Sequence, residues 1–123
     1  LMELHTISPE GGYTQDDVME LAKIMTGWRP KWSKKLDNGA DIKFDHERHE
    51  PGKKTVLGKK YKRGGKGIYL AIKDLVNHPS CRKFIATKLC RYLITDNPTS
   101  EMITPIIKVW EKKLLRKVLI ILT

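Results

Sequence analysis

The sequence predicts a mainly α-helical fold of four or five packed helices with a small irregular or β-hairpin insertion. Apolar residues recur at helical spacing near the start of the chain and throughout its second half. Between residues 29 and 67, glycine, proline and lysine interrupt that spacing. The 123 residues, 40% apolar and 31% charged, fit one globular domain. We therefore expect a single domain over residues 1–123, with residues 29–67 as its basic loop or hairpin.

The first helix is predicted from about Gln15 to Thr26. Thr14 precedes it as a hydroxyl cap, acidic residues follow at the positive helix end, and Gly27 closes it. Its apolar residues fall at i, i+3, i+4 and i+7, namely Val18, Leu21, Ala22 and Met25. In the interrupted stretch that follows, short extended segments at 42–44 and 55–57 could pair as a hairpin.

Helical spacing resumes at Ile68 and continues through Leu75. Asn77-His78-Pro79 then ends one helix and supplies a cap and a first-turn proline for the next. Later apolar stripes comprise Cys81, Phe84, Ile85, Leu89 and Tyr92, and, after a cap at Thr99 or Ser100, Ile103, Ile106, Ile107 and Trp110. The apolar residues 114–122 predict a last helix, unless one long helix runs on from Glu101. The expected core comprises Leu21, Met25, Ile72, Leu75, Phe84, Ile85, Leu89, Ile103, Ile107 and Trp110.

The two cysteines are expected to be buried free thiols. Nine helical residues separate Cys81 from Cys90, which puts them on opposite helix faces and about 13 Å apart, too far for a disulfide. No window of about 18 apolar residues occurs, so no membrane span is predicted.

Positive charge is concentrated in the insertion. The chain has a formal charge of +10, and 13 basic against 5 acidic residues between positions 29 and 66 account for +8 of it. Seven basic residues follow one another without an acid, Lys53, Lys54, Lys59, Lys60, Lys62, Arg63 and Lys66, with Tyr61 among them. Such a run can neutralise phosphates and stack on a base, so nucleic acid or another polyanion is a candidate partner. A solvated, lysine-rich loop is the alternative.

Residues 45–50 are the densest group of potential metal ligands. His46 and His49 are three residues apart, but the His-Glu-x-x-His spacing of zinc proteases is absent. His46 and His49 are weak candidate metal ligands, and His5, His49 and Glu50 are weak candidate catalytic residues. The glycines at 58–67 lack the spacing of a phosphate-binding loop, so neither ATP nor GTP binding is predicted, and no cofactor is expected.

Several segments together resemble the bacterial domain-of-unknown-function 1800 family. They are residues 2–6 (MELHT), 11–18 (GGYTQDDV), 26–28 (TGW), 49–58 (HEPGKKTVLG) and the His78-Pro79 pair. The resemblance implies a portion of a larger bacterial protein and names no activity. The positions that match the family's pattern are His5, Tyr13, Asp16, Trp28, His49, Lys54 and Gly58. Glu50 departs from it, since the family usually has Asp there.

Three classes of function remain open. The first is a helical structural or partner-binding portion of a larger protein, with a protein partner or self-association through the apolar C-terminal helix. The second is polyanion binding through the basic run. The third is an enzyme site that uses His5, His49 and Glu50, with or without a divalent metal. The first class is the main expectation.

Overall fold

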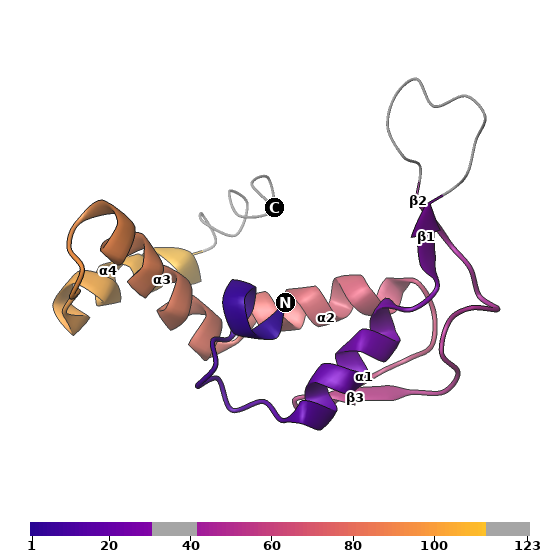
Figure 1. Ribbon diagram of the computed structural model, residues 1–123. Helices are drawn as coiled ribbons and strands as arrows, with labels where there is room; N and C mark the ends of the chain where they lie inside the picture. Colours follow the sequence, from indigo (N-terminus) through magenta and orange to yellow (C-terminus); the bar gives the residue numbers. More distant parts are fainter. Residues whose placement is uncertain (31–41, 113–123) are drawn as a thin grey trace, which may run out of the picture. The chain divides into compact units, whose positions relative to one another are not determined.

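The computed structural model describes residues 1–30 and 42–112, which belong to two compact units (Figure 1). One unit comprises Gly12–Asp74, and the other joins Leu1–Gly11 to the chain from Leu75 onward. Of the residues described, just over half belong to five helices, and four short strands form two antiparallel pairs. The helix-rich fold with small β insertions is therefore confirmed, whereas a single domain stays a prediction.

Helix α1 (Gln15–Met25) begins where the sequence predicts. The Thr14 hydroxyl accepts the Asp17 N–H at 3.2 Å, and the Asp17 carboxylate accepts the Thr14 N–H at 2.9 Å. This reciprocal pair satisfies two amides that a helix start leaves unpaired. The chain turns away at Thr26, and Gly27 follows with a φ of +86°.

Two of the four strands in the described residues lie at or within one residue of the predicted extended segments, but the predicted pairing between these two was wrong. Strand β1 (Trp28–Pro30) pairs with β2 (Ile42–Phe44), and β3 (Lys54–Val56) pairs with β4 (Lys59–Tyr61). Leu57 and Gly58 connect β3 to β4 with φ of 49° and 74°, as a two-residue hairpin turn requires. Because so short a loop costs little entropy to close, β3 pairs with its immediate neighbour rather than with β2.

Helix α2 (Lys66–Asn77) begins two residues before the predicted start, and most of it belongs to the Gly12–Asp74 unit. Side chains from α1, the β3–β4 hairpin and α2 are buried in this unit: Leu21, Ile24, Val56, Tyr61 and Ala71. The aromatic rings of Trp28, Phe44 and Tyr69 meet edge to face within the same unit.

The other unit contains a single-turn π-helix, η1 (Met2–Thr6), and helices α3 (Pro79–Leu93) and α4 (Ser100–Glu111). The predicted start of α3 is confirmed, since the His78 ring accepts the Ser80 N–H at 3.3 Å and Pro79 is the first helical residue. Between α3 and α4 the core comprises Ala86, Cys90 and Ile103, with Ile106 and Ile107 packed against them. The predicted last helix, residues 114–122, lies outside the described residues.

Part of the predicted core was wrong. Leu21, Leu75, Ile103 and Trp110 are buried as expected, but Met25, Ile72 and Leu89 are exposed. In α3 the buried residues are the small ones, Cys81, Ala86 and Cys90, and both cysteines are free thiols as predicted. Small side chains let neighbouring segments approach closely, so α3 buries these residues and leaves larger apolar side chains such as Leu89 outside.

Candidate functional site

His49 is a buried link between three segments of the Gly12–Asp74 unit. Its side chain is 3% exposed, and its Nδ1 lies 2.9 Å from the Thr26 carbonyl oxygen. A carbonyl only accepts, so Nδ1 carries the proton and Nε2 is the acceptor. Nε2 accepts the Gly64 N–H at 3.2 Å and lies 3.3 Å from Lys54 Nζ. The ring therefore joins the end of α1 to β3 and to the turn before α2.

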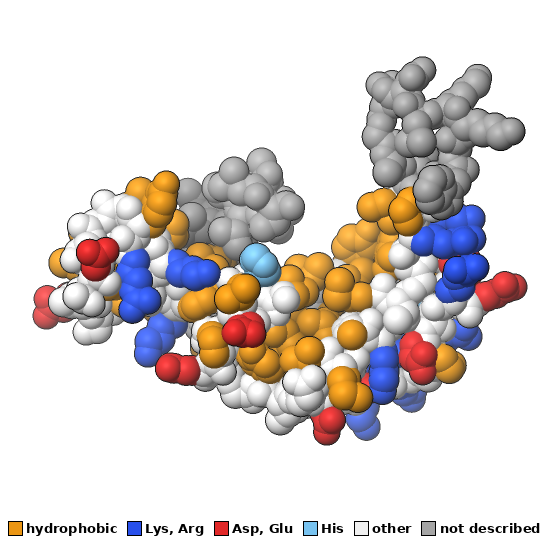
Figure 2. Space-filling model, in the orientation of Figure 1, with side chains coloured by type: hydrophobic (Ala, Val, Ile, Leu, Met, Phe, Trp, Pro, Cys, Tyr) orange, Lys and Arg blue, Asp and Glu red, His pale blue; other side chains and the backbone are white. Residues whose placement is uncertain are grey.

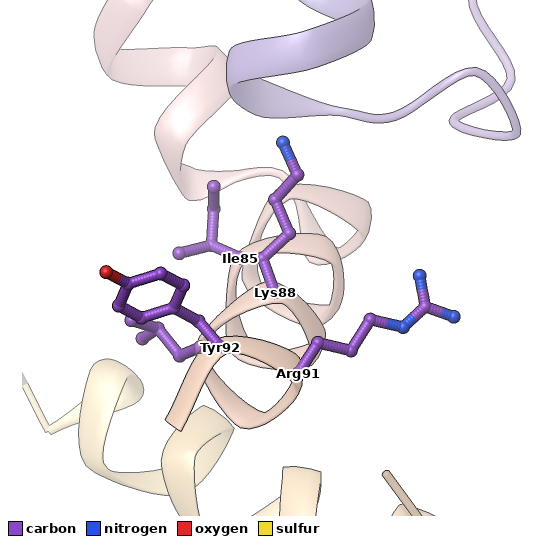
Figure 3. A pocket seen from close by; sticks show the side chains of 5 residues that line it. Ile85, Lys88, Arg91 and Tyr92 are labelled. Carbon is purple, nitrogen blue, oxygen red and sulfur yellow. The ribbon is translucent and has the colours of Figure 1, made fainter. Parts of the chain in front are cut away.

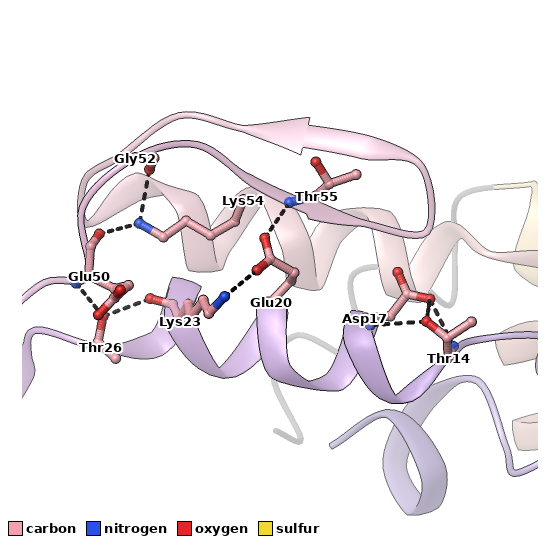
Figure 4. A network of polar contacts seen from close by, with 9 residues as sticks. All are labelled: Thr14, Asp17, Glu20, Lys23, Thr26, Glu50, Gly52, Lys54 and Thr55. Atoms are coloured by element: carbon pink, nitrogen blue, oxygen red, sulfur yellow. Dashed lines mark hydrogen bonds and ion pairs between the residues drawn. The ribbon is translucent and has the colours of Figure 1, made fainter.

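Lys54 is buried beside it, with 1% of its surface exposed. Its ammonium donates to the Gly52 carbonyl at 3.0 Å and to the Glu50 carbonyl (Figure 4). It also donates to His49 Nε2. Burial lowers the pKa of Lys54. Three acceptors for three ammonium protons are what a buried lysine needs, so this amine is fully engaged in holding the chain.

Two carboxylates of α1 accept N–H groups of β3 and of the turn that follows it, and Figure 4 shows the bond from Thr55 to Glu20. Asp17 Oδ1 accepts the Leu57 N–H at 2.7 Å, and Glu20 Oε2 accepts the Thr55 N–H at 2.9 Å. The N–H groups of alternate residues along an edge strand point away from the paired strand. Those of Thr55 and Leu57 are accepted by Glu20 and Asp17, which lie about one turn apart on α1. A backbone hydrogen bond from Thr14 is the main cause that lowers the pKa of Asp17, and the Leu57 amide adds to it.

Asp74 of α2 anchors the opposite strand of the hairpin. Lys59 Nζ and the Tyr61 hydroxyl each lie 2.8 Å from its carboxylate oxygens. Burial opposes ionisation of Asp74, but the hydrogen bonds from Lys59 and Tyr61 outweigh it and lower its pKa. Burial, followed by the bond to Asp74, raises the pKa of Tyr61.

The candidate catalytic and metal residues do not form one constellation within the unit that holds His49. Both ring nitrogens of His49 are engaged, while His46 is exposed and packs its ring edge-on against Phe44. Glu50 is exposed, and His5, also exposed, belongs to the other unit. Across residues 1–30 and 42–112, no three His, Cys, Asp or Glu side chains are placed to hold a metal ion.

The residues of the basic run, Lys53 to Lys66, have different environments and contacts. Lys54 is buried, Lys59 forms an ion pair with Asp74 at 2.8 Å, and Arg63 donates to the His46 carbonyl at 2.7 Å. The other members are exposed: Lys53, Lys60, Lys62 and Lys66. On the face drawn in Figure 2, the Lys and Arg side chains of the hairpin-bearing part lie among Asp and Glu rather than in one continuous patch.

One exposed apolar surface of the described helices lies on α3 and includes Leu89, which the sequence analysis assigned to the core. Leu89, Tyr92 and Leu93 of α3 are 37%, 88% and 71% exposed. Leu89 and Tyr92 line an open groove with Ile85, Lys88 and Arg91. In Figure 3, Ile85 and Tyr92 project from the same side of α3, and Arg91 projects away from them. The apolar spacing was visible in the sequence, but spacing alone does not say which face is covered by the protein itself.

Comparisons with known proteins return one family. The model of the family described as "Protein of unknown function (DUF1800)" matches residues 1–120, the family that the sequence motifs resemble. No curated protein and no solved structure matches the chain. None of the helices in the described ranges is long and apolar enough to cross a membrane.

Proposed function

Because the chain belongs to a family of proteins of unknown function (DUF1800), its role must be inferred from its own surface, and we propose that it is a helical partner-binding portion. The partner is an amphipathic helical segment of another protein, with acidic residues beside its apolar stripe. The exposed apolar face of α3, defined by Ile85, Leu89, Tyr92 and Leu93, receives it. This face is the single observation that carries the proposal.

The first supporting step is the distribution of apolar residues around α3. The small residues Cys81, Ala86 and Cys90 are buried, while the larger side chains of the exposed apolar face lie largely in water. A cluster of exposed apolar side chains on a helix marks a candidate surface for binding another protein. Burying one large apolar side chain fully is worth about 1.5–3 kcal/mol, so covering this face would stabilise a complex substantially.

The second supporting observation is the positive charge of the groove. The charged residues that line the groove, Lys88 and Arg91, are both basic, and the whole chain carries +10. Acidic residues at the margins of a partner's apolar stripe would meet these cations and would be steered toward the chain. A second copy would instead place Lys88 and Arg91 near like charges. Charge complementarity therefore favours an acidic partner over self-association.

A designed peptide pair tests this proposal. We expect a fluorescently labelled amphipathic helix with glutamates beside its leucine stripe to bind the chain, and the same helix with lysines in those positions to bind at least about tenfold more weakly. Fluorescence anisotropy measures both affinities. Replacing Leu89 and Tyr92 with Ser should abolish binding of the acidic peptide, whereas Met19→Ser, a matched change at an exposed methionine of α1, should leave it unchanged.

Two results would contradict the proposal. One is equal affinity for the acidic and basic peptides. The other is a stable dimer in sedimentation equilibrium that Tyr92→Ser dissociates, because the apolar face of α3 would then bind a second copy.

Polyanion binding is a second candidate, favoured by the exposure of Lys53, Lys60, Lys62 and Lys66 around the hairpin. Replacing these four with Gln leaves the anchoring residues Lys54, Lys59 and Arg63 in place, so the fold should persist. Binding of labelled single-stranded and duplex nucleic acid should fall by nearly one log unit per phosphate contact for each log unit of salt, and the variant should show a smaller slope. Absence of binding at low salt would reduce the run to a solvated surface.

The enzyme class gains no support from the described geometry. A general base or metal ligand needs an available nitrogen lone pair. Nε2 of His49 already accepts from Gly64 and Lys54, and the side chain is buried. We therefore assign His49 a structural role.

A further inference from the structure

A second cavity lies within the unit that contains α3, between the loop at residues 8–10 and the N-terminal part of the helix. Its volume is about 430 Å³, and it is lined by Ser8, Pro9, Glu10, Ser80, Lys83, Phe84, Thr87 and Arg91. Only Arg91 also lines the groove of the apolar face. The partner-binding proposal makes no use of this cavity.

The loop wall of the cavity is held in place. Ile7, directly before it, is fully buried, and the Gly11 N–H donates to the Ser8 carbonyl at 3.1 Å. A Cβ on Gly11 would lie 1.9 Å from Ile7 Cγ2, so the turn packs too tightly for any side chain there. Lys88 of α3 donates to the Leu4 carbonyl at 3.0 Å, which ties the chain just before the loop to the same helix.

The helix wall is cationic. Lys83, Thr87 and Arg91 recur every four residues, so they form one row along α3 with successive Cα atoms about 6 Å apart. Within the part of the chain that the structure describes, neither cation forms an ion pair. The Thr87 hydroxyl already donates to the Lys83 carbonyl at 2.8 Å. Among the cavity's hydroxyl groups, those of Ser8 and Ser80 have no described acceptor.

We propose that this cavity binds a small anion with two charged groups, such as a diphosphate or a dicarboxylate. Lys83 and Arg91 bind the two charged groups from either side of Thr87, and Ser8 and Ser80 donate hydrogen bonds to them. The ring of Phe84 supplies an apolar surface between them. Glu10 on the loop wall repels negative charge, so the anionic groups lie toward α3 and an uncharged or cationic part of the ligand lies toward the loop.

A titration followed by NMR tests the site on the whole chain. We expect pyrophosphate to cause saturable shifts of the Ser80, Lys83 and Thr87 amides, and orthophosphate to bind more weakly. Replacing Lys83 or Arg91 with Gln should weaken binding roughly two- to fivefold, the range for exposed ion pairs. Lys108→Gln on α4 removes the same charge outside the cavity and should leave the affinity unchanged. Leu89→Ser, which disrupts the proposed partner surface, should also leave it unchanged.

Glu10, on the loop wall of the cavity, is expected to weaken anion binding, so removing its charge should have the opposite effect to removing Lys83 or Arg91. Glu10→Gln should tighten pyrophosphate binding, while Glu3→Gln, the same charge change on η1, should not. Succinate in place of pyrophosphate distinguishes a carboxylate ligand from a phosphate one, and saturable binding of either at these amides supports the site. Shifts confined to residues 59–67, shifts that do not saturate, or a Lys83→Gln variant that behaves like Lys108→Gln would overturn it.

Discussion

Lys54 illustrates how a charged residue is accommodated inside a small unit. Its 1% exposure would be costly for an unpartnered ammonium, but the chain supplies one acceptor for each proton. The acceptors are the ring of His49 and two carbonyls of the turn that precedes β3. The lysine therefore fixes the shape of that turn as well as satisfying its own charge.

Lys54→Met should destabilise the chain by about 1–3 kcal/mol, because it keeps the apolar stem and leaves three acceptors without their donor. Urea unfolding measures the change. Lys53→Met, the same substitution at the exposed neighbouring lysine, should stay within about 0.5 kcal/mol of the wild type. Equal effects of the two variants would contradict the structural role assigned to Lys54.

Gly27 is required at the end of α1 for two separable reasons. It has a φ of +86°, and a Cβ there would lie 2.8 Å from the Asp45 carbonyl oxygen and 3.0 Å from His49 Cβ. Gly52 has a similar φ of +82° but open space around it. Comparing alanine substitutions at Gly27 and Gly52 therefore separates the cost of backbone strain from the cost of steric crowding.

Gly52→Ala should cost about 1–2 kcal/mol, the strain of a left-handed alanine. Gly27→Ala should cost more, because the chain must also move away from Asp45 and lose the hydrogen bond from the Asp45 N–H to the Gly27 carbonyl, 2.8 Å long. Thermal or urea unfolding of both variants checks this order. Equal losses of stability in the two variants would contradict this prediction, because they would mean that the chain around Gly27 can move to make room for a Cβ atom.

Among the elements of the structure, α1 and the β3–β4 hairpin are joined by two acidic side chains of α1 that accept N–H groups of the hairpin. Asp17 closes the helix start through Thr14 and holds the hairpin turn through the Leu57 amide. Glu20, one turn later, holds Thr55. Asp17 was expected only as a favourable charge at the helix start, and Glu20 was assigned no role. Their bonds to the hairpin require the strand to lie alongside α1.

Stability should therefore depend on the ionisation of Asp17. Its pKa is lowered in the folded state, so folding favours the carboxylate. The contribution of this carboxylate to the free energy of unfolding is complete above about pH 3.9, the pKa of Asp in the unfolded chain. It is lost as the pH falls through the lower pKa of Asp17 in the folded chain. Asp17→Asn should cost about 1 kcal/mol near neutral pH, as for loss of a helix cap, and the difference from the wild type should shrink at acidic pH.

Urea unfolding between pH 2 and 7 measures this dependence. Asp16→Asn is the matched control, since it removes the same charge from the neighbouring exposed position, which holds no strand amide. A loss for Asp17→Asn that does not change with pH would contradict the proposed ionic contribution.

At the scale of the whole molecule, the contacts divide the chain into two compact units, while composition and length predict one domain. We expect the two to unfold together, since each has only a small buried core and small cores are marginally stable alone. Residue-resolved hydrogen exchange at increasing urea checks this. A common midpoint for amides of α1 and α4 would support one domain, and well-separated midpoints would contradict it.

The local features of this protein can be read from its sequence. The starts of α1 and α3 follow from Thr14 and His78-Pro79, because capping depends on residues within one turn. Of the two candidate caps for α4, Thr99 is the N-cap residue, without a side-chain hydrogen bond. The free thiols of Cys81 and Cys90 follow from their spacing. Family membership follows from motifs spread over most of the chain.

Which segments meet depends on the packing of the chain. The pairing of Ile42–Phe44 with β1 rather than β3, the burial of the small rather than the large apolar residues of α3, and the burial of Lys54 all depend on contacts between residues distant in sequence. Periodicity shows that a face is apolar but not what covers it. For that reason the exposed face of α3 and the cationic row beside it, on which both proposals depend, emerged only once the packing partners of α3 were known.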